Sequence, residues 1–261
     1  TLYRGPRSNG ISHLELAIQN GFCYSVVNAP VIIADGVKSK AVAELPSGPE
    51  HFQSIRIGKA IAEADALVTM NHFKGHMVTS FGGAIKNLSM GCGSRATKQR
   101  MHADMKPVLT SDEQCIGCGQ CVEICPVNAI AVENGTAGFD HDKCVGCSEC
   151  LACCPVHAIR VQWGGTSRNV QEKMAEVALS VKKFFKTKQL HFNFLLNITP
   201  ECDCLKWTDN PIVQDIGILA SKDPVALDQA SLDLVRKAPG LNDSALPEPG
   251  CAGQDKFPLV H

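Results

Sequence analysis

Apolar residues recur at helical spacing in several stretches of the chain, and these stretches predict its helices. The longest covers residues 169–186. Another begins at Pro224, because a proline suits the first helical turn, and ends near residue 237. Shorter helices are predicted over residues 11–20, over residues 54–64 and from Gly82 through Leu88.

Continuous or alternating apolar runs predict strands between these helices. They cover residues 26–34, 66–70, 190–198 and 213–220. Because strands and helices alternate on both sides of residues 107–164, the sequence predicts an α/β fold with a mixed or mostly parallel sheet and flanking helices. The last two dozen residues are rich in proline and glycine, and we expect them to loop over the surface.

Residues 115–154 contain two copies of one cysteine run, offset by 29 residues. Each copy reads C-x2-C-x2-C-x3-C-P, the pattern with which bacterial-type ferredoxins bind two [4Fe–4S] clusters, the fourth cysteine of each run ligating the other cluster. Gly117 allows the tight loop that turns backbone N–H groups toward sulfur. We therefore predict an inserted α+β ferredoxin-like domain at residues 107–164, within a discontinuous α/β domain of residues 1–106 and 165–261. One cluster is expected on Cys115, Cys118, Cys121 and Cys154, and the other on Cys144, Cys147, Cys150 and Cys125.

Two zinc sites, or the disulfides of a secreted domain, are the alternatives for these cysteines. Zinc ribbons usually have two well-separated C-x2-C pairs, whereas each run here places four cysteines within eleven residues. The doubled register therefore favours clusters. The same offset relates Cys125 to Cys154, so Cys154 is the expected last ligand and Cys153 a buried neighbour.

Composition narrows the setting in which the protein works. Ten of the 14 cysteines lie between residues 92 and 154, which favours a reducing cytoplasm and oxygen-poor chemistry over disulfides. No apolar run is long enough for a membrane span, and a formal charge of −1 gives no reason to expect nucleic-acid binding. Residues 112–163 carry seven acidic and two basic side chains. This acidic surface suits docking to a redox partner protein, and an ordinary solvated surface explains it equally well.

Four polar segments follow the ends of predicted strands, which is where open α/β sheets bind ligands. One shared cleft is therefore favoured over four independent loops. The segments are Asp35, residues 72–76, the loop that holds Cys202 and Cys204, and residues 221–223.

The residues of this cleft suit an anionic substrate. His72, Lys74 and His76 lie two residues apart and point the same way on an extended chain, so they suit anion binding, metal ligation or acid–base catalysis. Solvated loop side chains are the alternative. Lys74 and His76 are the candidate catalytic pair, and the N-terminus of the predicted helix adds backbone donors. A small carboxylate or phosphate is expected to bind at His72, Gly82, Gly83, Lys86 and Asp223.

Cys92, Cys202 and Cys204 have no place in the ferredoxin pattern. With a histidine as the fourth ligand they would bind an additional metal. As free thiols in an anaerobe's cytosol they would bind none. The sequence leaves both interpretations open and favours the free thiols.

Several runs outside the cysteine repeat carry a family resemblance. They are H-F-K-G-H at residues 72–76, F-G-G-A-I-K-N-L at 81–88, M-G-C at 90–92, C-D-C at 202–204 and S-K-D-P-V-A at 221–226, with Asp228. These runs resemble the uncharacterised iron–sulfur centre proteins, a domain-of-unknown-function family with a two-cluster ferredoxin inserted in an α/β domain. The resemblance covers nearly the whole chain and implies an anaerobic redox role without a settled substrate.

Three hypotheses follow from these features. In the first, the two clusters relay low-potential electrons to or from a partner protein. In the second, the protein is a reductase whose α/β domain binds an anionic substrate or cofactor, or a third metal, and receives electrons from the clusters. In the third, it is an electron-wire or scaffold subunit of a larger redox complex, which an exposed apolar patch on the 169–186 helix would favour.

Overall fold

The computed structural model describes residues 7, 9–48, 50–102, 107–125, 127–144, 149–161, 167–204, 207–247 and 250–260. The chain divides into two compact units, each assembled from segments that are distant in sequence. The predicted boundaries of an inserted domain at residues 107–164 stay a prediction. Unit 1 comprises residues 1–44, 54–63 and 93–166, and unit 2 comprises residues 45–53, 64–92 and 167–261.

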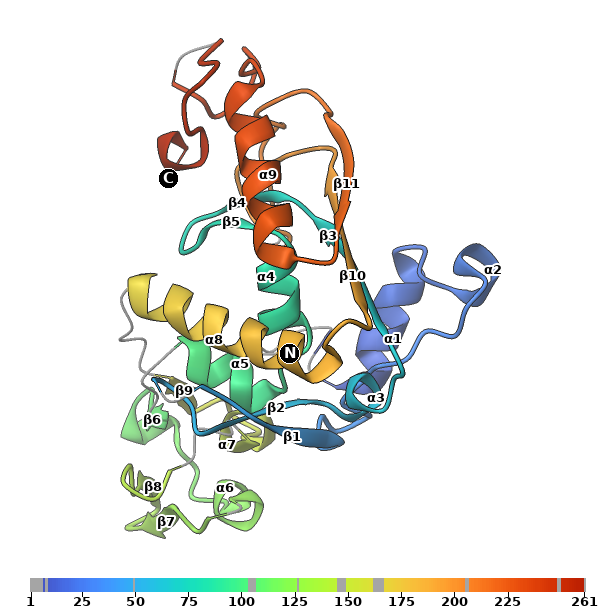
Figure 1. Ribbon diagram of the computed structural model, residues 1–261. Coiled ribbons are helices and arrows are strands. Elements are labelled where there is room, and N and C mark those ends of the chain that lie inside the picture. Colours follow the sequence, from blue (N-terminus) through green and yellow to red (C-terminus); the bar gives the residue numbers. More distant parts are fainter. Residues whose placement is uncertain are drawn as a thin grey trace. The chain divides into compact units, whose positions relative to one another are not determined.

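Unit 2 is built around a three-stranded sheet in the order β11–β10–β3. The central strand β10 (Gln189–Leu195) pairs in parallel with β3 (Leu67–His72) and antiparallel with β11 (Gly217–Ser221). Helix α9 (Pro224–Lys237) lies along β10 and β11 (Figure 1). The predicted α/β class and the mixed sheet are thereby confirmed.

The other elements of unit 2 surround this sheet. A short helix, α4, packs against α8, α9, β3 and β10, and the π-helical turn η1 that continues it packs against α8. Helix α8 buries Val170, Met174, Val177, Val181 and Phe185 on one face, whereas Phe184 is exposed. The bounds are β4 (Lys74–His76), β5 (Ser80–Gly82), α4 (Ala84–Lys86), η1 (Asn87–Gly91), α8 (Ser167–Phe185) and η3 (Phe257–Leu259).

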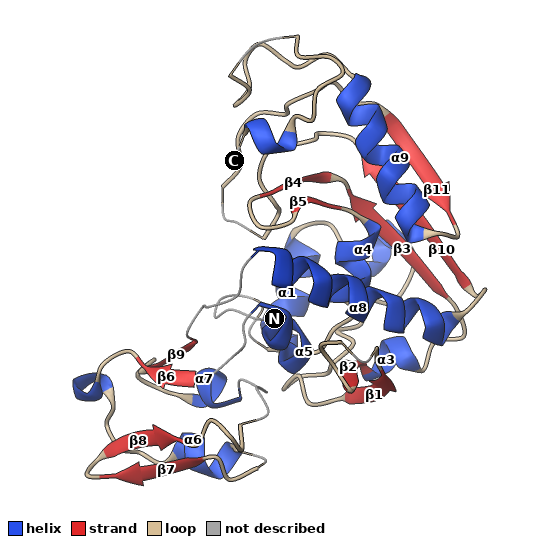
Figure 2. Cartoon of the chain, turned by 60° about the vertical axis from the view of Figure 1, so that its left-hand side comes forward, coloured by secondary structure: helices blue, strands red, loops and turns tan. Residues whose placement is uncertain are grey.

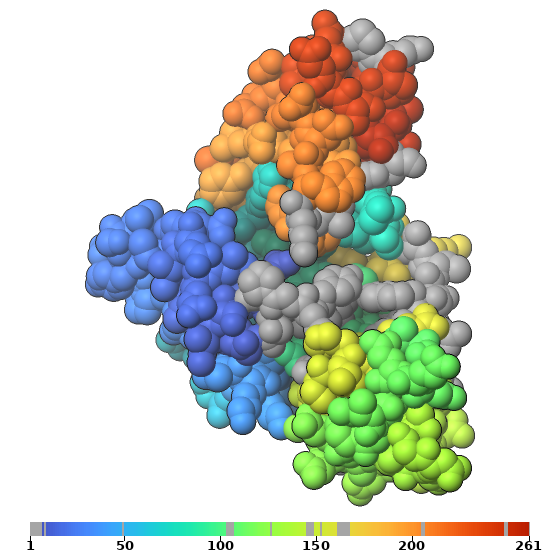
Figure 3. All heavy atoms as spheres, turned by 180° about the vertical axis from the view of Figure 1, so that it is seen from behind, coloured from blue at the N-terminus to red at the C-terminus, as the bar shows by residue number. Residues whose placement is uncertain are grey.

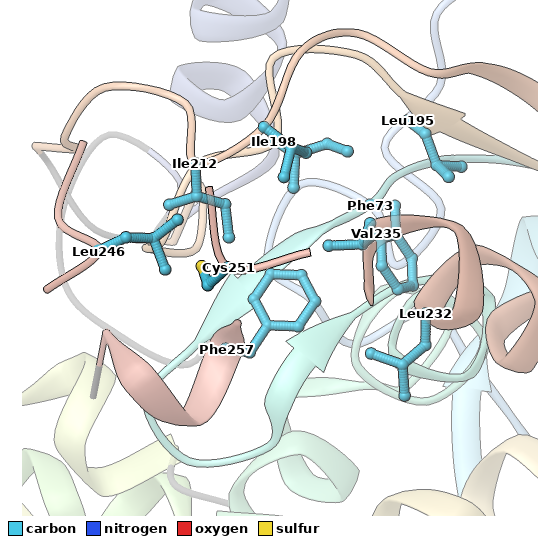
Figure 4. Close-up of a cluster of buried hydrophobic side chains, with 10 residues drawn as sticks. Phe73, Leu195, Ile198, Ile212, Leu232, Val235, Leu246, Cys251 and Phe257 are labelled. Atoms are coloured by element: carbon cyan, nitrogen blue, oxygen red, sulfur yellow. The ribbon is translucent and has the colours of Figure 1, made fainter. Parts of the chain in front are cut away.

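The main core of unit 2 includes the end of the chain (Figure 4). Phe73 and Leu195 are buried there together with Leu246, Cys251 and Phe257. The expectation that the last two dozen residues loop over the surface is therefore wrong for these three C-terminal side chains. Proline and glycine mark irregular backbone, and irregular backbone still carries apolar side chains into a core.

Lys256 joins this C-terminal segment to α9. Its side chain is fully buried, and its Nζ donates to the carbonyl oxygens of Val235 at 3.0 Å and Arg236 at 2.9 Å. These carbonyls belong to the last turn of α9, where helix acceptors lack partners and a positive charge is favourable. Burial lowers the pKa of Lys256.

A chain of hydrogen-bonded amides crosses the sheet of unit 2. The Nδ2 atom of Asn87 donates to Asn71 at 2.7 Å, that of Asn71 to Asn193 at 3.0 Å, and that of Asn193 to Asp228 at 2.8 Å. Asp228 also accepts the backbone N–H groups of Ala84 at 2.8 Å and of the next residue at 3.0 Å. Burial raises the pKa of Asp228, and these three donors oppose the rise. The network fixes the N-terminus of α4 to α9.

The N-terminal part of unit 1 departs from the sequence prediction at two places. Over residues 26–34 the predicted strand is wrong, because α2 (Tyr24–Val27) is followed there by irregular backbone. Residues 54–64 are a strand, β2 (Ser54–Gly58), followed by α3 (Lys59–Ala62), and not one helix. The other elements are α1 (Gly10–Gln19), α5 (Arg95–His102) and β1 (Val42–Pro46), of which residues 42–44 belong to unit 1.

Residues 11–37 expose many of the large apolar side chains of unit 1. The segment is seen as blue spheres in Figure 3. On α8 of unit 2, by comparison, only Leu179 and Phe184 are exposed among the large apolar side chains that the structure describes. The exposed residues of the N-terminal segment are Ile11, Ile18, Phe22, Tyr24, Val26, Val27, Ile32 and Val37.

The cysteine repeat occupies the rest of unit 1 and forms two small antiparallel sheets with two short helices (Figure 2). Strand β6 pairs with β9, β7 pairs with β8, and α6 packs against α7. The bounds are β6 (Pro107–Leu109), η2 (Asp112–Gln114), α6 (Gln120–Ile124), β7 (Ile130–Glu133), β8 (Thr136–Phe139), α7 (Glu149–Cys153) and β9 (Ile159–Val161).

None of the helices in the described part of the chain has the length and apolar character that crossing a membrane requires.

The carboxylate of Asp228 provides the first test of this fold. We expect Asp228→Asn to lower the free energy of unfolding by about 1–3 kcal/mol, because its amide group would leave one buried backbone donor without an acceptor. Asp233→Asn is the matched control on the same helix. The Asp233 side chain is 49% exposed, so this change should alter stability by less than about 0.5 kcal/mol. Urea unfolding followed by circular dichroism measures both, and hydrogen exchange in α4 and β10 locates the loss. Equal stabilities would contradict the role given to Asp228.

Candidate functional site

Four of the predicted cluster ligands line one recess in unit 1. They are Cys115, Cys118, Cys121 and Cys154, and apolar side chains such as Val132 and Ile159 form the walls. Four sulfur donors around an apolar recess suit a soft metal or an iron–sulfur group. The structure thus brings together the first three cysteines of one run and the last cysteine of the other.

The backbone around this recess repeats with the sequence. The N–H of Ala129 donates to the Sγ of Cys125 at 3.2 Å, and the N–H of Ala158 donates to the Sγ of Cys154 at 3.3 Å. Asn128 and His157, which the 29-residue offset relates, both have positive φ, at 51° and 61°. The same loop is therefore built twice, with a backbone donor to the last cysteine of each run.

The second set of predicted ligands is described in part. Cys150 is buried, Cys144 and Cys125 are half-buried, and Cys147 lies outside the described residues. Cys153 donates its thiol to the carbonyl of Cys150 at 3.4 Å and does not line the recess. Burial raises the pKa of Cys153 to about 11, with further contributions from neighbouring cysteines.

A second group of polar side chains gathers in unit 2, where β3 and β10 both end. The hairpin β4–β5 follows β3, and residues 196–204 follow β10. The N–H of Gly75 donates to the carbonyl of Thr199 at 2.9 Å, and a Cβ atom at Gly75 would overlap the carbonyl oxygen of Pro200. Only a glycine allows the two segments to approach so closely.

Asp203 joins the two segments through charge. The Nδ1 atom of His72 lies 3.0 Å and the Nζ atom of Lys74 lies 2.9 Å from its carboxylate. The Nε2 atom of His72 faces the carbonyl oxygens of Leu196 at 3.0 Å and Asn197 at 3.1 Å. Because both ring nitrogens face acceptors, this environment favours the imidazolium form of His72, which donates from both nitrogens.

The pKa values of this pair shift in opposite directions. The hydrogen bond to Asp203 raises the pKa of His72 above its ordinary value of 6.5, against the effect of burial. Burial alone would raise the pKa of Asp203, but the hydrogen bond from His72 and the charge of Lys74 hold it well below its ordinary value of 3.8. The contact therefore favours the charged form of both partners.

Two thiols follow in the same turn. The Nζ atom of Lys86 lies 2.7 Å from the Sγ of Cys202, and the Nε2 atom of His76 lies 4.0 Å from the Sγ of Cys204. The Cys204 thiol and then the Lys86 charge lower the pKa of Cys202, although burial opposes them. The Cys202 sulfur and burial raise the pKa of Cys204. A negative charge on the pair is thus favoured on Cys202 and the proton on Cys204.

These residues also bear on the predicted third metal. In the described part of the chain, one group of possible ligands has its donor atoms close enough together to bind a single metal ion. It consists of His76, Cys202 and Cys204. Cys92 is buried beside η1 and is not a member of that group.

The predicted anion site at the start of α4 is occupied by the protein's own carboxylate. The amides of Ala84 and Ile85 donate to Asp228, and a Cβ atom at Gly83 would collide with that side chain. Gly82 instead leaves room for Lys86, whose Cδ would lie 2.9 Å from a Cβ at that position. The two glycines thus serve packing in this structure.

The prediction that residues 221–223 share this edge is wrong. Because β11 is antiparallel to β10, Ser221 pairs with His191, near the beginning of β10. Asp223 therefore lies toward the opposite end of the sheet, where it caps α9 and pairs with Lys182 at 2.9 Å. Asp35 belongs to unit 1 and follows no strand in the described part of that unit.

Sequence reasoning gives no role to Asp203 or Asp228, which hold the edge together. For Asp203 the available signal is its place between two cysteines that are themselves candidates. For Asp228 the family resemblance names the residue, but its partners lie far away in sequence.

Comparison with models of protein families identifies the family of this chain. A family model described as Domain of unknown function (DUF362) matches residues 1–233. The chain belongs to this family. The family's description names no activity, so membership in it leaves the chemistry to be argued from the residues.

Two individual proteins are similar to parts of this DUF362 chain. Ferredoxin-2 of Desulfomicrobium norvegicum is 47% identical over 30 residues, which cover 12% of this chain and 51% of that ferredoxin. The chain thus matches about half the length of this curated relative. The lactate racemase apoprotein from Thermoanaerobacterium thermosaccharolyticum aligns with a TM-score of 0.41 and 13% identity, covering 86% of this chain and 38% of that structure.

The ion pair of His72 and Asp203 predicts how the stability of this contact depends on pH. The raised pKa of His72 gives stability that is complete below pH 6.5 and is lost as the pH rises through the folded-state pKa. The lowered pKa of Asp203 gives stability that is complete above pH 3.8 and is lost as the pH falls. The contact between the two segments is therefore strongest between pH 3.8 and 6.5.

Nuclear magnetic resonance titration of His72 measures this effect directly. We expect a midpoint above 6.5 that falls in Asp203→Asn, because the carboxylate no longer favours the imidazolium. Asp209→Asn is the matched control and should leave the midpoint unchanged, because the exposed Asp209 carboxylate accepts the backbone N–H of Asn210 instead. A His72 midpoint that stays the same in both variants would contradict the assigned contact.

Proposed function

We propose that this protein is an iron–sulfur electron-transfer protein with two [4Fe–4S] clusters. Cys115, Cys118, Cys121 and Cys154 would hold one cluster. Cys144, Cys147, Cys150 and Cys125 would hold the other. The clusters would relay low-potential electrons between partners in an oxygen-poor cytoplasm.

The recess in unit 1 carries this proposal. Its four cysteines come from both runs, which is the exchange of the fourth ligand that two-cluster ferredoxins use. The match to Ferredoxin-2 over 30 residues supports the same interpretation. The doubled loop, with an N–H donor to Cys125 and to Cys154, supports a second site like the first.

The chain's own residues would determine how such clusters behave. When bound, a [4Fe–4S] cluster supplies one-electron transfer. Apolar residues such as Val132, Val156 and Ile159 would exclude water from the sulfurs, and the N–H donors of Ala129 and Ala158 would stabilise negative charge on them. The seven acidic residues of the segment 112–163 would attract a redox partner protein with a basic surface.

A reductase is the second candidate, and the edge of unit 2 favours it. Lys74, His76 and Lys86 lie there close to Cys202, Asp203 and Cys204, and these contacts support a site for an anion. In this candidate the edge receives electrons and binds a small anionic substrate or cofactor. The role of a scaffold subunit stays a prediction.

Metal analysis of protein purified without oxygen tests the cluster proposal. We expect about eight irons and eight sulfides per chain, and a paramagnetic signal after reduction with dithionite. Cys118→Ser should remove about half of the iron, because it breaks one of the two ligand sets. Cys153→Ser is the matched control and should keep all of it, since its thiol does not line the recess. Colourless protein that binds zinc, or equal iron loss in both variants, would contradict the proposal of two clusters.

A further inference from the structure

The turn after β10 places two thiols beside one imidazole. The Sγ atoms of Cys202 and Cys204 and a ring nitrogen of His76 all lie within 4.8 Å of one another. Cys202 is buried, whereas Cys204 is exposed. The sulfur of Cys204 is therefore the one that a small molecule can reach, whereas the sulfur of Cys202 is shielded from solvent.

Lys86 supplies a positive charge to the buried sulfur. Its Nζ lies 2.7 Å from the Sγ of Cys202, a distance at which an ammonium group stabilises a thiolate. The side chain reaches this position from α4 across Gly82, where a larger residue would collide with it. The N-terminus of α4 is in turn held by Asp228.

His76 is positioned as a hydrogen-bond donor. Its Nδ1 atom accepts the backbone N–H groups of Val78 and Thr79, both at 3.1 Å. A neutral imidazole whose Nδ1 accepts must carry its proton on Nε2, the atom that lies 4.0 Å from the Sγ of Cys204. A metal ligand would need the opposite arrangement at Nε2. The tautomer thus favours a thiol pair over a metal site.

From this geometry we propose that Cys202 and Cys204 form a redox-active dithiol that reduces the disulfide bond of a low-molecular-weight disulfide. Lys86 stabilises the charge on Cys202, and the Nε2–H of His76 stabilises charge that develops on Cys204. The activity is separate from the cluster proposal, because every group that it uses belongs to unit 2.

Exchange proceeds in two steps that balance. In the first, the exposed sulfur of Cys204 attacks the substrate disulfide while its proton passes to the thiolate of Cys202. The substrate S–S bond breaks, a mixed disulfide forms on Cys204, and the first product leaves as a thiolate. In the second, Cys202 gives its proton to that product and its sulfur attacks Cys204. The Cys202–Cys204 disulfide forms, and the second product leaves as a thiolate.

The distances leave a short movement for ring closure. A disulfide has an S–S bond of about 2.0 Å, and the two sulfurs start within 4.8 Å of each other. Rotation of the exposed Cys204 side chain brings them together while Cys202 stays beside Lys86. The two electrons that the dithiol loses are the two that the substrate gains.

Peptide mapping isolates this pair from the other cysteines. Cleavage after Lys188 and Lys206 releases residues 189–206, which contain Cys202 and Cys204 and no other cysteine. Holoprotein is equilibrated without oxygen in mixtures of reduced and oxidised glutathione, quenched with N-ethylmaleimide and digested. We expect the peptide to pass from two alkylated thiols to an intramolecular disulfide, lighter by two hydrogens than the dithiol, as the mixture becomes more oxidising.

Two variants distinguish the roles of the sulfurs. Cys202→Ser loses the thiolate that accepts the proton of Cys204, so its first step should be slower than in the wild type. At equilibrium it should still accumulate the mixed disulfide with glutathione on Cys204, because the second step is blocked. Cys204→Ser should accumulate little, because the remaining sulfur is buried. The same glutathione adduct on both variants, or on neither, would overturn the proposed order of attack.

Lysine variants test the activation of the pair. Lys86→Met should slow disulfide formation at neutral pH roughly tenfold or more, because less of the pair carries a thiolate. Lys182→Met, which removes an equivalent charge that pairs with Asp223 instead, should match the wild type. Equal rates in the two lysine variants would overturn the role of Lys86.

Metal analysis distinguishes a redox-active dithiol from a metal site. A peptide 189–206 that stays reduced in every glutathione mixture overturns the proposal. So does a non-iron metal that is present in the wild type and absent from Cys202→Ser, since a metal site would then explain the cluster of His76, Cys202 and Cys204. Because the readout is one peptide of unit 2, loss of the iron–sulfur clusters would leave this experiment interpretable.

Discussion

The parallel pairing of β3 with β10 is the constraint on which unit 2 depends. Six residue pairs, from Gln189 with Leu67 to Phe194 with His72, join strands that are far apart in the sequence. Parallel neighbours end at the same edge of a sheet, so the segments that follow them must meet. The contact of Gly75 with Thr199 and the ion pair of Lys74 with Asp203 are direct consequences.

The polar interior of unit 2 extends this constraint to the thiols. Asn71 on β3 and Asn193 on β10 are hydrogen-bonded to each other across the pairing, and Asn193 passes the connection to Asp228. Asp228 then holds the start of α4, and α4 carries Lys86 to Cys202. A buried network that is satisfied at each step positions a charge far more reliably than a surface loop would.

Local signals predict the elements that local interactions determine. The helix at 224–237 has its predicted bounds because Asp223 and Pro224 form a strong start. The cysteine spacing points to a set of four sulfurs that the recess in unit 1 indeed brings together. The strand predicted at 26–34 is wrong because a short apolar run with Asn28 and Pro30 inside it does not determine a structure.

Interactions between distant segments account for the other errors. Ile55 and Ile57 are both buried on a strand, a two-residue period that the apolar spacing of the following residues conceals. The direction of β11 is set by its pairing, and no local pattern reports it, so the sequence assigns the loop at Asp223 to the wrong end of the sheet. The meeting of Lys86 with Cys202 has no local signal either, because 116 residues separate them.

The buried Lys256 ties α9 of this chain to residues that lie beyond the segment matched by the family model. The family model ends at residue 233, inside α9, whereas the helix relies on a lysine well beyond that point to satisfy its final carbonyls. Phe257, beside that lysine, fills the core against Phe73. A recombinant fragment that ends at residue 233 would lose both Lys256, which binds the last carbonyls of α9, and Phe257, which fills the core. Fragments for expression should therefore extend beyond the segment that the family model matches.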